Sequence, residues 1–237
     1  MDGAWRGGIA VLPQTAQLIY SNPLRSALDT ADFRMEGEAR VSFPDGVMRL
    51  ENVLDPSLGQ QSNFVYWCPE TFPSDIAISW EFRPLREPGL AMMFLAASGR
   101  QGEDLFDAAL AERRGEYGQY HSGDINAFHV SYFRRRYPEE RAFHTCNLRK
   151  SYGAHLVCQG ADPIPYAVDA SAPYRMLIVK SKEKLQLFIQ ELKIFEWRDD
   201  GASWGPLLGG GKIGFRQMAP LVAEYANLQV YDLGKGR

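Results

Sequence analysis

The stretch YGQYHSGDINAFHVSYFRRR, residues 117–136, concentrates side chains that can transfer protons or bind charged groups. It holds two of the four histidines of the chain, together with an Asp, an Asn and three arginines. Histidine and tyrosine can act as general base and general acid, and arginine binds a carboxylate through two parallel N–H groups. A second polar run, AFHTCNLRK at 142–150, follows closely. The two runs together could move a proton next to a bound carboxylate.

One chemistry that uses such a set is β-elimination at a uronate, the acidic sugar of pectin-like polysaccharides. It needs a base for the C5 proton, an acid for the leaving oxygen, and cations that stabilise the charge developing on the carboxylate. We expect His129 or His121 as the base and Tyr132 as the acid. The substrate-binding candidates are Gln119, Asp124, Asn126, Arg134, Asn147, Arg149 and Lys150.

The run from 127 to 136 alternates as a β-strand does, so residues two apart share a face. Phe128, Val130, Tyr132 and Arg134 would then share one face, and His129 would lie on the other. Because His129 and Tyr132 are three apart, either a bulge intervenes or only one of them lines the site.

The rest of the chain predicts an all-β fold. Short aromatic and β-branched runs recur every 8 to 15 residues between Gly and Pro, which favours an antiparallel sandwich. A hairpin is indicated around Pro44–Gly46. The segment GEDLFDAALAERRG at 102–115 is either a short helix or an ordered loop. We therefore expect two antiparallel sheets with one or two short helices.

The same motifs carry a resemblance to a known family. YGQYHSGDINAFHVSYFRR, NLRKSYG and GADPIP resemble the bacterial domain family of unknown function DUF1961, and the similarity runs from about Asn63 to YANLQVYDL at 225–233. The resemblance implies a concanavalin A-like jelly roll with a concave face. Some members are encoded among pectin-utilisation genes, which implies a carbohydrate ligand, although one fold can host many functions.

Length and charge narrow the possible partners. With 237 residues the chain suits one jelly-roll domain over 1–237, and a net charge of −3 argues against nucleic acid as a partner. No apolar run is long enough to cross a membrane, and the apolar part of residues 1–14 is too short for a signal peptide. We therefore expect a cytoplasmic protein with an oligosaccharide ligand, and the oligomeric state stays open.

Two other functions use the same scaffold. A glycoside hydrolase needs two carboxylates across the scissile bond, but no ExDxxE run is present, and Glu191 and Glu196 point to opposite faces of a strand. Asp124 is then the remaining candidate carboxylate. A lectin-like module would bind sugar without any base and acid pair.

Metal and thiol chemistry are not expected. His121, Asp124 and His129 could assemble a zinc site by residue type, but their spacing matches no HxH or HExxH pattern. A structural calcium is possible for this fold class, with ligands that the sequence does not locate. The three cysteines have no CxxC spacing, and we expect all of them to be buried thiols.

Overall fold

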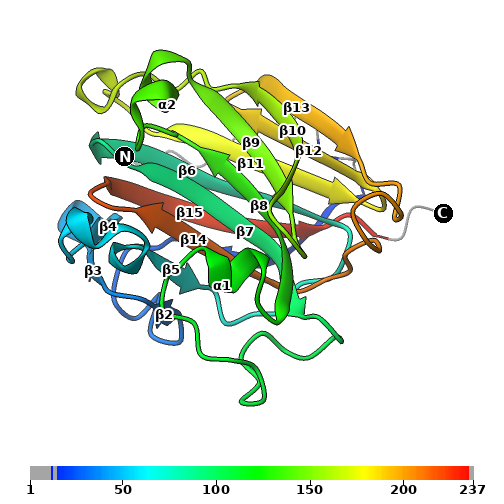
Figure 1. Cartoon of the computed structure of the whole chain (residues 1–237). Helices are drawn as coiled ribbons and strands as arrows, with labels where there is room; N and C mark the ends of the chain where they lie inside the picture. Colours follow the sequence, from blue (N-terminus) through cyan, green and yellow to red (C-terminus); the bar gives the residue numbers. More distant parts are fainter. Residues whose placement is uncertain (1–11, 13–14, 235–237) are drawn as a thin grey trace.

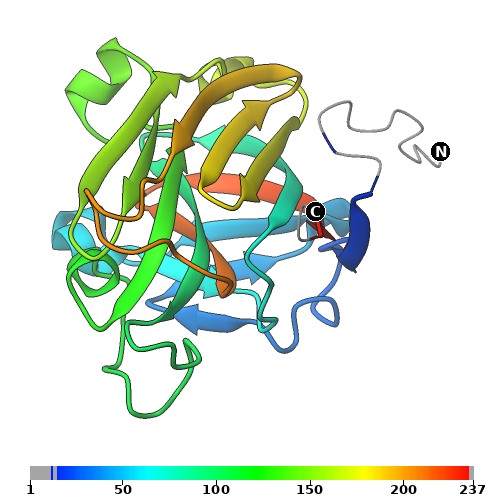
Figure 2. The same ribbon diagram turned by 90° about the vertical axis from the view of Figure 1, so that its right-hand side faces the viewer.

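Two antiparallel sheets pack face to face in the computed structural model, which describes residues 12 and 15–234 (Figures 1 and 2). The first sheet, sheet A, has eight strands in the order β13 (Leu192–Arg198), β12 (Lys184–Ile189), β11 (Tyr174–Ser181), β6 (Ile76–Arg86), β15 (Val222–Asp232), β4 (Met48–Asn52), β3 (Ala39–Ser42), with β1 (Gln17–Asn22) also paired to β15. The second, sheet B, has seven strands in the order β10 (His155–Ala161), β9 (Thr145–Lys150), β8 (Ile125–Tyr132), β7 (Leu90–Gly99), β14 (Lys212–Met218), β5 (Phe64–Trp67), β2 (Arg34–Glu36). The prediction of an antiparallel two-sheet sandwich is confirmed.

Helices are few and short. The described chain has two α-helices, α1 (Gly118–His121) and α2 (Pro138–Ala142), and three 3-10 turns at Pro44–Gly46, Pro56–Ser62 and Ala167–Asp169. The first of these turns joins β3 to β4, as the hairpin signal predicted. Most of residues 1–14, expected not to be a signal peptide, lie outside the described part of the chain.

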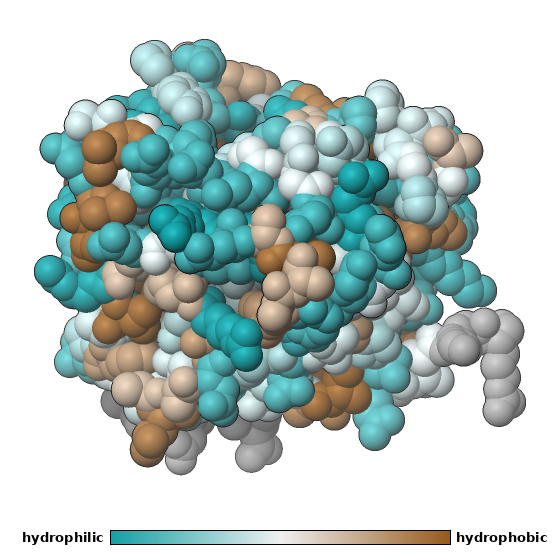
Figure 3. Space-filling view, turned by 60° about the horizontal axis from the view of Figure 1, so that its bottom comes forward, coloured by the Kyte–Doolittle hydropathy of each residue, from teal (hydrophilic) through white to brown (hydrophobic). Residues whose placement is uncertain are grey.

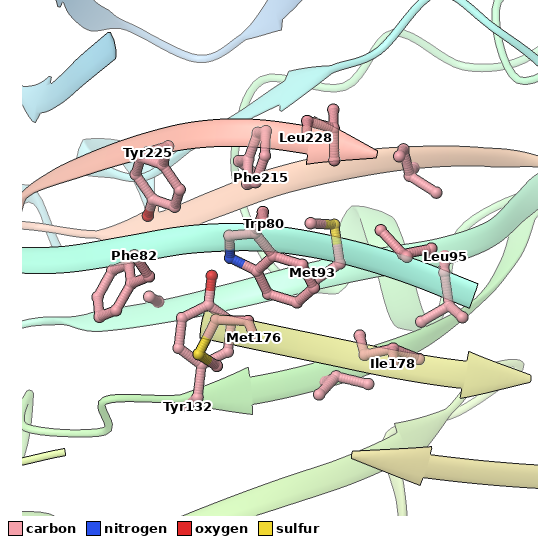
Figure 4. Packing of buried hydrophobic residues seen from close by; sticks show 14 of the residues in the cluster. Trp80, Phe82, Met93, Leu95, Tyr132, Met176, Ile178, Phe215, Tyr225 and Leu228 are labelled. Carbon is pink, nitrogen blue, oxygen red and sulfur yellow. The ribbon is translucent and has the colours of Figure 1, made fainter. Parts of the chain in front are cut away.

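The main core lies between the two sheets and is rich in aromatic rings (Figure 4). Tyr132 of β8 is fully buried there, with its ring centroid 5.7 Å from Trp80 and 5.0 Å from Phe82 of sheet A. Because strand residues alternate between faces, the buried Tyr132 directs His129 of the same strand to the outer side of sheet B.

A second apolar cluster covers part of that outer side. Residues 100–124 form an extended loop that ends in α1, and Leu105 and Tyr120 of this loop pack onto Trp67 and Phe94 of the sheet. The loop projects from the sandwich in both views (Figures 1 and 2). The segment 102–115 is therefore the ordered loop of the two alternatives. The side chain of Asp104 accepts a hydrogen bond from Phe106 N in a tight turn of this loop.

The strand alternation breaks directly after β8. Phe133 has a positive φ of 46° and turns its ring into the core between the sheets, next to that of Tyr132. The following Arg134 then points outward, to the same side of sheet B as His129 and not to the side of Tyr132 as alternation predicted. A single backbone reversal therefore adds a guanidinium to the outer face.

Candidate functional site

Cross-strand register aligns polar side chains in two rows on the outer face of sheet B. The first row contains Leu156, Arg149, His129, Phe94, Gly214, Trp67 and Arg34, and the second contains Gln159, Asn147, Ser131, Met92, Arg216, Val65 and Glu36. Directly opposite residues on neighbouring strands have Cβ atoms about 5 Å apart, so Arg149 lies next to His129. The polar half of the face is formed by β8, β9 and β10.

His129 is completely buried on this face and has a partner at each ring nitrogen. Its Nδ1 lies 2.8 Å from the Tyr117 hydroxyl and its Nε2 lies 2.9 Å from Ser151 Oγ. Burial lowers the pKa of His129 well below its usual value, and the nearby charges of His121, Arg216 and Arg149 act in the same direction. His129 is therefore neutral at pH 7 and is too enclosed to touch a ligand.

Tyr117 and His121 bring their rings to the same place from α1 and the residue before it. Their ring centroids are 4.7 Å apart, and the Tyr117 ring is 5.4 Å from that of His129. Burial raises the pKa of Tyr117 to about 12, although the charges of Arg149, Arg216 and Arg134 oppose the shift. Burial, with Arg149 and Arg216, lowers the pKa of His121. The site is thus electropositive even with both histidines neutral.

Two of these arginines lack a carboxylate partner among the described residues. Arg149 is half-buried and donates from Nη1 to Ala154 O at 2.5 Å. Arg216 is 1% exposed, donates to Gly115 O at 2.6 Å and to Gln60 Oε1 at 3.2 Å, and lies beneath the Tyr117 ring at 5.3 Å. A buried charge without a counter-ion is costly, and a bound anion would offset this cost.

Arg134 completes the polar face and is already paired. It donates from Nη2 to Glu140 Oε1 of α2 at 2.6 Å and from Nη1 to Thr145 Oγ1 at 2.6 Å. Nearby, the side-chain amides of Asn147 and Gln159 are in contact at 2.8 Å. These groups form a hydrogen-bonding surface beside Arg149.

Four predicted residues lie elsewhere. Tyr132 is enclosed between the sheets, and Lys150, 0% exposed, also faces inward, where its Nζ is 2.7 Å from Asp199. Asp124 accepts a hydrogen bond from Ala111 N and braces the 100–124 loop. Asn126 is half-buried in β8 between two outward-facing residues. The prediction of Tyr132 as acid and Lys150 as ligand is therefore corrected, because strand alternation and burial remove both from the face.

Gln119 lies in α1, and its side-chain Oε1 accepts a hydrogen bond from Arg114 N of the preceding loop at 2.7 Å. The predicted residues that the fold brings together are therefore His121, His129, Arg134, Asn147 and Arg149. Cysteine placement also differs in part from expectation, since Cys68 and Cys146 are buried but Cys158 is half-buried.

Sequence reasoning missed Tyr117, Ser151, Gln60 and Arg216. Tyr117 and Ser151 are in the quoted polar motifs, but only the fold shows that both reach His129. Arg216 follows the run IGF inside the fully buried strand KIGFRQM, and a charge in the interior of a central strand is a usable signal. Gln60 gives no local signal, because its contact with Tyr117 N at 3.2 Å spans 57 residues.

Hydrolysis finds little support on this face. Glu140 is bound to Arg134, and Glu36 is held by Arg113 at 2.8 Å. Asp124 is engaged with the loop backbone. These three carboxylates are thus committed to structural partners, whereas a hydrolase needs one acid and one free carboxylate across the bond.

A cavity of about 680 Å³ lies at the other end of the same face, bordered by Arg34, Phe106 and Lys212. Arg34 shares a row with His129 but lies four strands away, about 19 Å at the usual spacing of ~4.8 Å. Lys212 is already bound to Asp104 and Pro69 O. We place the candidate site at Arg149 and Arg216 because two arginines without a carboxylate partner among the described residues lie there beside Tyr117 and His121.

Figure 3 brings the lower side of Figure 1 forward and shows mainly hydrophilic residues, with apolar residues in small separate spots. No group of three or more His, Cys, Asp or Glu within the described chain is arranged to hold a metal ion. The described helices are also all too short or too polar to cross a membrane.

Fold and site together define a β-sandwich of the galectin-like and concanavalin A-like class with an electropositive patch on one sheet. The chain belongs to the family described as "Domain of unknown function (DUF1961)", whose model matches residues 17–230.

The similar proteins agree with this family assignment. "Uncharacterized protein YesU" from Bacillus subtilis strain 168 is 54% identical over 214 residues, which are 90% of this chain and 95% of that protein. A crystal structure of a protein of unknown function with a galectin-like fold, also from Bacillus subtilis, superposes with a TM-score of 0.88 at 54% identity, over 91% of this chain and 96% of that one.

More distant structures share the fold alone. The carbohydrate-binding module CBM66 from Bacillus subtilis superposes with a TM-score of 0.51 at 10% identity, over 83% of this chain and 92% of that chain. A Bacillus licheniformis β-glucanase superposes with a TM-score of 0.54 at 10% identity, over 92% and 99% of the respective chains.

Proposed function

We propose that the outer face of sheet B binds an acidic, uronate-containing oligosaccharide of the pectin type and catalyses its β-elimination. The scaffold is shared with carbohydrate-binding modules, lectins and a glucanase, which supports a sugar ligand. The acidic character of the sugar rests on the site itself.

One observation carries the proposal: Arg149 and Arg216 lie beside Tyr117 and His121 with no carboxylate partner in the described chain. Arg149 is half-buried and can reach a ligand, so its planar guanidinium suits a carboxylate. Arg216 is too enclosed for contact and adds a fixed positive field. Gln159 is exposed at the rim and can form a hydrogen bond to a sugar hydroxyl, and the buried Asn147 holds its amide at 2.8 Å.

His121 is the proton acceptor in this scheme. Its Nδ1 lies 2.6 Å from Ser122 Oγ, and donation of Nδ1–H to this oxygen leaves the Nε2 lone pair for the substrate. Its lowered pKa keeps it neutral at pH 7. His121 Nε2 takes the C5 proton, the C4–O bond breaks as the C4=C5 double bond forms, and the imidazolium then returns the proton to the leaving oxygen. Arg149 stabilises the negative charge that develops on the carboxylate during this step.

The test uses oligogalacturonate with calorimetry for binding and ultraviolet absorbance for the unsaturated product. His121→Ala should keep its affinity and lose product formation by about 100-fold or more, the usual scale for a general base. Arg149→Ala should lose affinity by about 10-fold or more, as expected for a charge-assisted hydrogen bond. Arg40→Ala, an exposed arginine of sheet A, is the matched control and should change neither.

A lectin-like module is the second candidate, because the same arginines would hold a uronate without turnover. Binding that depends on Arg149, with no unsaturated product from the parent protein, would support this candidate. New reducing ends without unsaturation would instead indicate hydrolysis. Absence of any binding to acidic oligosaccharides would reject the proposed ligand class.

A further inference from the structure

Ser151 Oγ lies at the end of a buried chain of hydrogen bonds. It has more polar neighbours than its single hydroxyl proton and two lone pairs can bond. It accepts from Ala127 N at 3.2 Å, faces two carbonyl oxygens, Tyr120 O and Ala127 O, each at 3.2 Å, and lies 2.9 Å from His129 Nε2. A hydroxyl has one proton to donate and two lone pairs to accept. The direction of the His129 contact therefore depends on where this proton goes.

The arrangement with the most satisfied buried groups sends the Ser151 proton to a carbonyl oxygen. His129 Nε2 then carries a proton and donates it to Ser151 Oγ, which fills the second lone pair of that oxygen. A neutral imidazole has a single N–H, so Nδ1 is an acceptor and must receive its hydrogen bond from the Tyr117 hydroxyl at 2.8 Å. The reverse arrangement takes the Ser151 hydroxyl proton away from Tyr120 O, whereas Ala127 O keeps the hydrogen bond that it accepts from Ser151 N at 3.1 Å.

We propose that Tyr117 is a specificity-determining residue of the site, whose phenolic oxygen is held by His129 and Ser151 as a hydrogen-bond acceptor for a hydroxyl group of the ligand. His129 and Ser151 are positioning residues in this assignment, because neither touches the ligand. The inference rests on the proposed function for the identity of the ligand. It adds that the sugar must present a hydroxyl next to its carboxylate.

The charged groups around Tyr117 favour the same hydrogen-bond direction, from the Tyr117 hydroxyl to His129 Nδ1. Arg216 lies 5.3 Å from the centre of its ring, and Arg149 and Arg134 act on it electrostatically. Cations repel a hydroxyl proton and attract the oxygen lone pairs, so the proton turns toward the uncharged His129. His121, Arg216 and Arg149 are the charged or titratable groups that act on His129. Each of them disfavours a second proton on its ring.

An acceptor at this position selects among anions. Chloride, sulfate and acetate have no hydroxyl to donate to Tyr117, whereas a uronate can donate a ring hydroxyl to Tyr117 while its carboxylate contacts Arg149. A site built to receive a hydroxyl rejects a ligand that lacks it more strongly than an apolar pocket rejects an extra group. Tyr117 would therefore separate sugar acids from other anions.

The hydrogen-bond polarity is tested on the free protein by ¹⁵N NMR of the imidazole nitrogens near pH 7. We expect His129 to be neutral with its proton on Nε2, and Tyr117→Phe to shift the Nδ1 resonance toward that of an unbonded nitrogen. Tyr152→Phe, which removes an exposed hydroxyl, is the control and should leave His129 unchanged. A proton on Nδ1 of His129 would overturn the assignment whatever the ligand.

The ligand contact is tested with digalacturonates that are each O-methylated at a single hydroxyl. In the parent protein, one derivative should bind about 2- to 10-fold more weakly than unmodified digalacturonate, the equivalent of one neutral hydrogen bond. In Tyr117→Phe, that derivative and unmodified digalacturonate should bind with equal affinity. Equal losses in both proteins for every derivative would overturn the contact. If no digalacturonate binds while His129 carries its proton on Nε2, the proposed function fails and the polarity of Tyr117 stands.

Discussion

Arg135 and Asp162 form an ion pair inside the sandwich, with Arg135 Nη1 3.0 Å from Asp162 Oδ2 and neither side chain exposed. The same carboxylate oxygen accepts from Phe133 N at 2.9 Å, at the residue where the chain reverses after β8. Arg135 Nη1 also donates to Arg134 O. This buried pair therefore stabilises the backbone conformation that turns Arg134 toward the outer face.

Asp162→Ala should lower the free energy of unfolding by about 3–5 kcal/mol, because it leaves the Arg135 charge buried without a partner. Chemical denaturation measures the change. Glu112→Ala breaks an ion pair of similar length, 2.7 Å, in which both side chains are 72% exposed. That control should change stability by less than about 1 kcal/mol. Equal effects of the two substitutions would show that burial does not govern the Arg135 pair.

Arg216→Met should separate stability from ligand binding. Removing a buried guanidinium with no carboxylate partner should not lower the free energy of unfolding, whereas affinity for oligogalacturonate should fall. Arg113→Met is the matched control, because Arg113 is also buried but is held by Glu36. It should destabilise the protein by about 3–5 kcal/mol, since Glu36 is left unpaired. A large loss of stability in Arg216→Met would mean that its bonds to Gly115 and Gln60 outweigh the desolvation cost.

Protonation of His129 makes the free energy of unfolding depend on pH. Its pKa in the folded state is lowered well below 6.5, mainly by burial, so the unfolded chain binds a proton that the native state does not. Stability is therefore fully present above pH 6.5 and falls as the pH drops toward the folded pKa, by up to about 1.4 kcal/mol per pH unit. The free energy of unfolding, measured by denaturation at several pH values between neutral and mildly acidic, should change less steeply with pH in His129→Gln than in the parent protein. An unchanged slope would contradict this assignment.

Lys150→Met should destabilise the protein and leave sugar binding unchanged. The substitution leaves the buried Asp199 carboxylate, which is 2.7 Å from Lys150 Nζ, without its ion-pair partner. It also removes the hydrogen bond from Lys150 Nζ to Gly205 O. We expect a loss of about 3–5 kcal/mol. Calorimetry on the folded variant should give the affinity of the parent protein. A specific loss of affinity would return Lys150 to the ligand-binding set.

The sequence by itself determined the strands and the side of the sheet on which each residue of β8 lies, because alternation is a local property of extended backbone. It placed Phe128 and Val130 opposite His129, and it left two alternatives, a bulge or only one of His129 and Tyr132 at the site, of which the fold shows the second. The motif resemblance determined the family and the sandwich, which the fold confirms. The density of polar and ionisable side chains in the two motifs also predicted that β8 and β9 carry the candidate functional residues.

Only the tertiary structure decided which polar groups meet. Arg134 changes face through a backbone reversal that alternation cannot predict, because it depends on Asp162 from a distant segment. Burial, which removes Lys150 and Tyr132 from the site, depends on what the opposite sheet presents. Tyr117 precedes α1, Ser151 follows β9 and Arg216 belongs to β14, and long-range packing alone brings them to His129. Such contacts leave no local pattern, since the free energy that selects them comes from closing the whole sandwich.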